Sequence, residues 1–163
     1  VVVANATIVP FLETYLEKLK RRVKLSLSVA KQGEILKMGN VYFAPQDMQA
    51  RILNTASGLS IDLKKEGPVC SQMPSSTVLF ESAASNIGAG TMAVLLGGFG
   101  TDGVEGLQKI RAIGGVTYVE NPSDAAFPYA PQKAIAMGIA DQILKADQMS
   151  DAITDLRNRR VAA

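Results

Sequence analysis

The chain has 163 residues and contains no histidine. Imidazole is the side chain that most often serves as a general base near neutral pH, so its absence excludes a Ser-His-Asp triad or a Cys-His pair formed within the chain. Cys70 is the single cysteine, which excludes an internal disulfide and predicts a reducing compartment, the cytoplasm. Without histidine or a second cysteine we expect no zinc site, and we expect no other metal or cofactor.

The sequence also has no long apolar run and no strong charge of either sign. No apolar stretch approaches the length of about 20 residues that spans a bilayer, so we expect no membrane insertion. The net charge of +2 does not indicate nucleic-acid binding. Lys18, Lys20, Arg21 and Arg22 form a basic group at the end of a predicted helix. The helix dipole favours positive charge there, and we expect these side chains to point into water.

The length and the apolar share of 47% suit a single domain over residues 1–163. In its first half we expect strands at 1–4, 25–29 and 41–44, a helix that Pro10 opens, and an antiparallel hairpin at 51–63. Helical spacing would place five side chains of that helix on one apolar face: Phe11, Leu12, Tyr15, Leu16 and Leu19. Because Val1 already lies in an expected strand, we expect part of the domain to precede it.

Strands and helices alternate regularly in the second half. Ser75 or Ser76 can cap a helix that ends near Gly88. After it we expect a strand at 91–96, a helix at 103–113, a strand at 116–119, a short helix at 131–138, a strand at 142–144 and a final helix through Leu156. This alternation predicts a three-layer α/β fold, in which helices cover both faces of a mainly parallel sheet and the hairpin is an antiparallel addition.

The segment GGFGTDG at 97–103 connects one of these strands to the following helix. Gly98, Gly100 and Gly103 have the G-x-G-x-x-G spacing of a dinucleotide-binding turn, and Glu120 ends the next strand, where such sites carry an acid for the ribose. Asp102 argues against this function, because a carboxylate at the helix N-terminus would occupy its N–H groups and repel a pyrophosphate. Dinucleotide binding is therefore a distant alternative.

Asp102 itself has two interpretations. It can cap the helix at 103–113, since Glu105 follows three residues later as in a capping box. It also lies at the carboxyl end of a central strand, where open α/β sheets place functional sites. The spacing of the residues does not separate a structural role from a functional one.

Three stretches resemble the CheB-type receptor methylesterases of bacterial chemotaxis. VAKQGEILKMGNVYFAP at 29–45 is similar to the family's A-x-x-G-x-x-x-x-x-G-x-V-Y-x-A-P pattern, and VLFESAA at 78–84 resembles its helix before the central strand. The segment 97–144 is similar throughout to the family's C-terminal half, including A-P-x-x-A-I-x-x-G at 130–138. These matches occur in the family's order with compatible spacing, and the resemblance covers nearly the whole chain.

The resemblance implies an α/β domain that hydrolyses glutamate methyl esters on chemoreceptor helices and, in some members, deamidates receptor glutamines. It places the acid of a Ser-His-Asp triad on Asp102, and the nucleophilic serine in a first strand and loop that precede residue 1. The implied partners are chemoreceptor cytoplasmic helices or other chemosensory proteins, and many relatives carry a receiver domain.

The sequence departs from the family at three positions around this site. The triad histidine aligns with Ala6, or with Asn5 after a slip of one residue, and neither side chain can act as a general base near neutral pH. The basic residue that usually precedes the Pro-Ser pair is Met73 here, and the Asp that follows the pair is replaced by Thr77. These changes predict a degenerate member of the family.

Two functions follow from this comparison of residues. The first is a catalytically impaired or inactive domain that acts in interaction or regulation. The second is a working methylesterase or deamidase, with its serine upstream and an unusual base supplied by water or by another chain. The missing histidine favours the first, because the loss of a triad member costs several orders of magnitude in rate.

Overall fold

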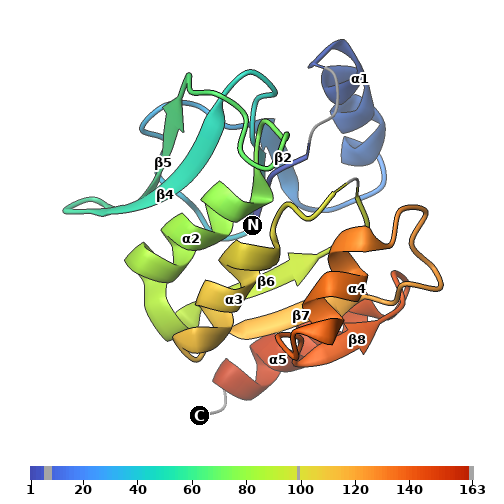
Figure 1. Cartoon of the computed structure of the whole chain (residues 1–163). Helices are drawn as coiled ribbons and strands as arrows, with labels where there is room; N and C mark the ends of the chain where they lie inside the picture. Colours follow the sequence, from blue (N-terminus) through green and yellow to red (C-terminus); the bar gives the residue numbers. More distant parts are fainter. Residues whose placement is uncertain (6–8, 99, 162–163) are drawn as a thin grey trace.

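The computed structural model describes residues 1–5, 9–98 and 100–161. Its elements follow the order expected from the sequence and form an α/β fold with helices on both sides of parallel strands, which confirms the predicted fold class (Figure 1). Ala6, one of the two positions expected to correspond to the family's histidine, lies outside the described residues. Within them, no helix is both long enough and apolar enough to cross a membrane.

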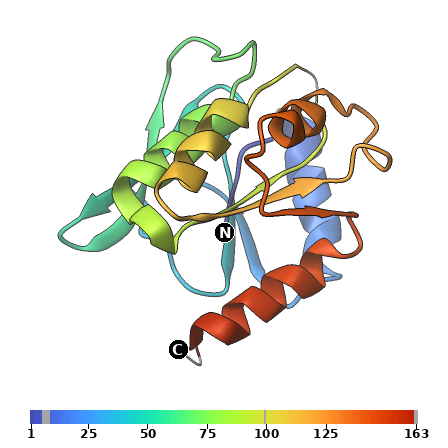
Figure 2. The same ribbon diagram turned by 60° about the horizontal axis from the view of Figure 1, so that its bottom comes forward.

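The parallel strands form two separate sheets of three strands each. The first has the order β1 (Val2–Val3), β3 (Asn40–Phe43), β2 (Ser26–Val29). The second has the order β6 (Met92–Leu95), β7 (Val116–Glu120), β8 (Gln142–Leu144). The N-terminus, where β1 begins, lies close to β6 in two views of the ribbon (Figures 1 and 2). The sequence predicted a single sheet. In the described residues β1 and β6 do not pair with each other, so each is an unpaired edge strand of its own sheet.

The helices lie in two layers on opposite sides of these strands (Figure 2). One layer contains α2 (Ser76–Ile87), α3 (Val104–Ala112) and α4 (Tyr129–Ala136). The other contains α1 (Val9–Lys20) and α5 (Met149–Val161). Each strand contributes side chains to both helix layers, because successive side chains point to opposite faces of the sheet. Phe43 packs in the cluster under α1, whereas its neighbour Tyr42 packs against the hairpin.

The antiparallel hairpin consists of β4 (Gln49–Thr55) and β5 (Gly58–Lys64), slightly longer than predicted. Its side chains join α2 to the first sheet, since Ile52 packs with Leu79 and Ala83 of α2. The short 3-10 helix η1 (Gly88–Gly90) then leads from α2 into β6. Helix α2 is thereby packed against the first sheet, whereas β6, which follows it, belongs to the second.

One expected burial pattern is wrong. Leu12 and Leu16 of α1 are buried as the helical spacing predicts. Phe11 and Tyr15, expected on the same apolar face, are 66% and 49% exposed. The apolar stripe of α1 is therefore wider than the part of the sheet that α1 covers.

Candidate functional site

Asp102 lies in the corner between β6 and α3, but its carboxylate does not cap α3. That helix starts from Gly103, which has a left-handed φ of 88° and no side-chain cap. The carboxylate instead reaches the start of α2, where Oδ2 accepts a hydrogen bond from the Ser76 N–H at 2.6 Å. Oδ1 accepts from the Ser75 hydroxyl at 2.5 Å and from the Thr77 N–H at 3.2 Å. The predicted capping box with Glu105 is wrong, because Asp102 caps the neighbouring helix.

Thr77 of α2 makes the reciprocal contact, with the start of α3. Its buried Oγ1 accepts a hydrogen bond from the Gly103 N–H at 2.7 Å. The first N–H groups of a helix have no partner within the helix, so each of the two helix starts supplies an acceptor that the other needs. At this position, where the resemblance led us to expect an Asp, the Thr77 hydroxyl serves as an acceptor that joins the two helices.

The two helix starts approach each other closely at the glycines of the corner. A Cβ added to Gly106 would lie 2.7 Å from the Thr77 carbonyl oxygen and 2.6 Å from the Phe80 Cβ. A Cβ added to Gly103 would lie 2.6 Å from the Leu95 Cδ1. The third glycine of the G-x-G-x-x-G spacing therefore allows helix and strand to pack, and the start of α3 faces protein. This packing does not favour a bound dinucleotide.

Ser75 is the N-cap of α2, whereas the sequence left Ser75 and Ser76 as alternatives. The side chain of Ser75 is completely buried. Its hydroxyl donates to Asp102 and accepts from the Val78 N–H at 3.4 Å, while its own N–H donates to the Gln49 Oε1 at 2.9 Å. A hydroxyl that is buried and engaged in this way cannot reach a substrate as a nucleophile. The contribution of the buried Gln49 side chain has no local signal in the sequence.

Glu120 ends β7 as predicted, but its carboxylate is not simply solvated. It is half-buried, and its Oε2 accepts a hydrogen bond from the Gly97 N–H at 2.6 Å. Glu120 thus joins the end of β7 to the end of β6. Among the residues that the structure describes, no group of three or more cysteine, aspartate and glutamate side chains is arranged to hold a metal ion.

The carboxyl edge of the second sheet therefore presents two carboxylates whose oxygens accept backbone N–H groups. Such carboxylates can orient and stabilise their donors, but without an imidazole beside them they do not form the base that activates a serine hydroxyl in a triad. Asn5, the second alignment candidate for the family's histidine, lines a shallow hollow on α1 together with Phe11 and Tyr15. Met73 is half-buried in the segment before α2.

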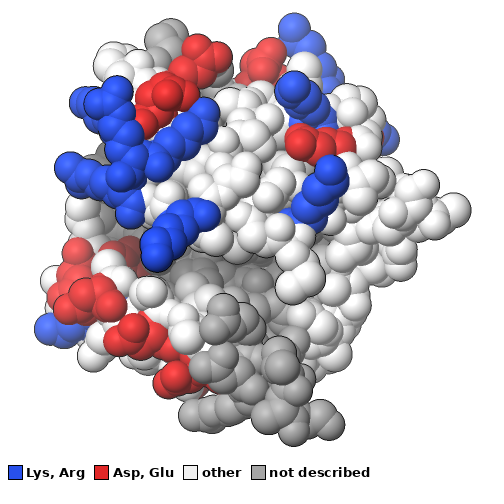
Figure 3. All heavy atoms as spheres, turned by 180° about the vertical axis from the view of Figure 1, so that it is seen from behind, with Lys and Arg blue, Asp and Glu red and all other residues white. Residues whose placement is uncertain are grey.

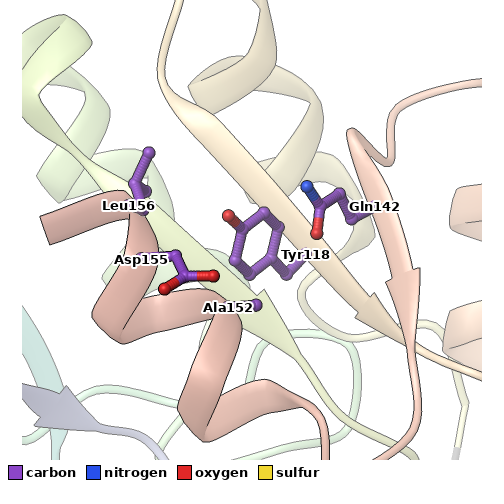
Figure 4. Close-up of a pocket in the computed structure, with 5 residues that line it drawn as sticks. All are labelled: Tyr118, Gln142, Ala152, Asp155 and Leu156. Carbon is purple, nitrogen blue, oxygen red and sulfur yellow. The ribbon is translucent and has the colours of Figure 1, made fainter. Parts of the chain in front are cut away.

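A separate hollow of about 180 Å³ lies between α5 and the strands β7 and β8 (Figure 4). Its lining residues are Tyr118, Gln142, Ala152, Asp155 and Leu156. None of them belongs to the corner or to α2. This hollow is on the α5 side of the sheet, so it is not part of the site around Asp102.

Comparisons with known proteins match this fold and this corner. The model of the CheB methylesterase family matches residues 1–153. A protein-glutamate methylesterase/protein-glutamine glutaminase of Anaeromyxobacter dehalogenans is 35% identical over 88% of this chain, and one of Rhizobium meliloti is 31% identical over 92% of it. The chain spans 41% and 42% of the lengths of these relatives.

The structural comparison agrees with the sequence comparisons. The crystal structure of the Thermotoga maritima CheB methylesterase catalytic domain superposes with a TM-score of 0.90 at 26% identity. The match covers 95% of this chain and 82% of that domain. The resemblance of the corner and of the segments around it is thus supported over almost the entire chain, which belongs to the CheB methylesterase family.

Proposed function

We propose that this chain is a cytoplasmic chemosensory domain that has lost methylesterase activity and acts by binding. The observation that carries this proposal is the environment of Asp102. Both of its carboxylate oxygens accept hydrogen bonds from the start of α2, and the whole chain has no histidine for this acid to orient. The candidate partners are chemoreceptor cytoplasmic helices or other chemosensory proteins, because the chain belongs to the CheB methylesterase family.

The physical argument rests on the role of the acid in a triad. The acid holds the imidazole in the correct tautomer and stabilises its charged form, while the imidazole takes the proton of the serine hydroxyl. Asp102 has an N-capping role that explains its presence without any imidazole. Retention of the acid therefore does not indicate retention of the reaction.

We further propose that the domain includes one more parallel strand, between β1 and β6, contributed by a segment of the protein upstream of Val1. The two open edges support this, because an exposed strand edge leaves a row of unpaired N–H and C=O groups. Amide hydrogen exchange on β1 and β6 tests it. Both strands should gain protection when the upstream segment is present, and unchanged exchange in both would refute the extra strand.

Release of methanol from methylated receptor fragments tests the proposed loss of activity. We expect a rate at background, because a hydroxyl without a general base is a weak nucleophile near neutral pH. Release of ammonia from receptor glutamines, measured in parallel, should also stay at background. An intact member of the family serves as the positive control.

Asp102→Asn is the matched variant, since it keeps the size of the side chain and removes its charge. If hydrolysis occurs in the natural chain and is lost in this variant, Asp102 orients a base after all. The working hydrolase, with its base from water or another chain, would then replace the present proposal.

A further inference from the structure

The outer face of α1 combines exposed aromatic side chains with a positive charge. Phe11 and Tyr15 are both exposed and, with Thr14 and Lys18, line a shallow hollow of about 400 Å³. Positions 11, 15 and 18 share one face of a helix. An exposed apolar surface that adjoins polar residues is typical of an interaction site.

The positive charge on this helix is mostly unpaired. Lys24 follows the basic group by two residues and is counted with it from here on. All five side chains are exposed. Lys20 pairs with Glu17, and this hydrogen bond and charge hold the pKa of Glu17 below its ordinary value. Among the described residues, the other four members make no ion pair: Lys18, Arg21, Arg22 and Lys24. The helix dipole accounts for charge in the last turn, but not for Arg22 and Lys24 beyond it.

A complementary acidic group lies at the beginning of α5. Asp147, Asp151 and Asp155 are exposed and follow each other at intervals of four residues. Asp151 and Asp155 therefore share one face of the helix. In the part of the chain that the structure describes, none of the three makes an ion pair. The sequence becomes basic only after Leu156, so this acidic group is confined to the first turns.

The two groups lie side by side on one face of the molecule. Helices α1 and α5 cover the same side of the strands (Figure 2). Seen from that side, Lys and Arg side chains gather over the end of α1, and Asp and Glu side chains lie directly below them (Figure 3). The basic group and the acidic group below it are together complementary to themselves, because a two-fold rotation places each group of one copy against the opposite group of the other.

We propose that this face binds a second copy of the chain, with α1 of each protomer against α5 of its partner. The paired charges orient the two copies, and the exposed Phe11 and Tyr15 add apolar contact at the edge of the interface. A second copy fits this face better than a uniformly acidic partner, which would meet the acidic group on α5 with like charge. The dimer does not depend on whether the chain hydrolyses esters.

Sedimentation equilibrium of the protein and three variants tests this dimer. The first variant, Lys18→Glu with Arg22→Glu, leaves two negative and two positive side chains among the four unpaired members of the basic group. The second, Asp151→Lys with Asp155→Lys, makes the acidic group positive. The third combines all four changes, and Lys65→Glu with Lys133→Glu is the matched control on other elements, since both lysines are exposed.

We expect a dimer of the natural protein and of the control at about 0.01 M salt, weakened at about 1 M salt, where the Debye length falls from about 30 Å to about 3 Å. Each two-residue reversal should raise the dissociation constant about tenfold or more, because it removes or reverses most of the attraction between the two groups. The four-residue variant should recover part of the affinity, since its new glutamates face its new lysines. An equimolar mixture of the first two variants should form a heterodimer, because the unaltered acidic group of the first variant faces the unaltered basic group of the second.

Several results would overturn the proposal. A natural protein that is monomeric at low salt, or a dimer that neither reversal weakens, excludes this interface. Loss of the dimer without recovery in the mixture shows that the two groups do not face each other. Binding of the monomer to vesicles that contain anionic lipid, abolished by Lys18→Glu with Arg22→Glu, would assign the basic group to a membrane surface instead.

Discussion

The two sheets have the same parallel pairing, but the core cluster under α1 is less enclosed than the cluster that packs with α3 and α4. Beside β6-β7-β8, five core side chains have an exposure of 0%: Val104, Leu107, Ile110, Val119 and Ala134. Beside β1-β3-β2, the cluster under α1 is smaller, and its buried members Leu12, Leu16, Leu27 and Phe43 retain 3–8%. The corner with Asp102 is mounted on the more enclosed half, whereas the family's histidine would follow β1 in the other half.

This difference is consistent with our proposal that the chain keeps the acid of the triad and has lost the histidine. Asp102 belongs to a network that joins α2 to α3, so packing alone favours its retention. The segment after β1 includes Ala6 outside the described residues and leads into α1, whose outer face is exposed.

The largest expected effect comes from truncating equivalent leucines in the two cores. Leu107→Ala should lie in the upper part of the range of about 2–5 kcal/mol for such changes, because α3 is enclosed and the site cannot collapse. Leu16→Ala should lie in the lower part, because α1 borders solvent and can settle onto the sheet. Urea denaturation of the two variants measures both free energies of unfolding. Equal losses would show that the two halves are enclosed equally.

A smaller effect is expected from Asp102. Asp102→Ala should lower the free energy of unfolding by about 1–3 kcal/mol, because three donors at the start of α2 lose their acceptor. Asp102→Ser should cost nearly as much, since a short side chain cannot reach α2, and Asp102→Asn should cost less because one oxygen remains. If serine instead preserves stability, Asp102 caps its own helix α3, where serine is a good N-cap.

Thr77→Val is the matched and smallest change in this network. It keeps the shape of the side chain and removes the acceptor of the Gly103 N–H, so we expect a loss of about 1 kcal/mol in chemical denaturation. The double variant with Asp102→Ala should not be additive, because the two residues belong to one network. Strict additivity would show that the two helix starts are stabilised independently.

The sequence by itself determined the order of the elements and the family. Helical periodicity placed Leu12 and Leu16 on a buried face, because this pattern follows from local geometry and from the burial of apolar surface. Ser75 was identified as a candidate cap for the same reason, since a cap and its helix are adjacent in the chain. The absence of histidine could likewise be read directly from the sequence, and it excludes an imidazole base within this chain.

The tertiary structure decided which groups these side chains meet. Spacing suggested that Asp102 caps the helix that follows it, but a carboxylate bonds to whichever N–H groups lie within reach, and packing brings the start of α2 closer. The same holds for Phe11 and Tyr15, whose helical spacing matches Leu12 and Leu16 although the sheet beneath α1 is too narrow to cover all four. A periodic pattern defines a face, whereas the extent of its burial depends on neighbours that are distant in the chain.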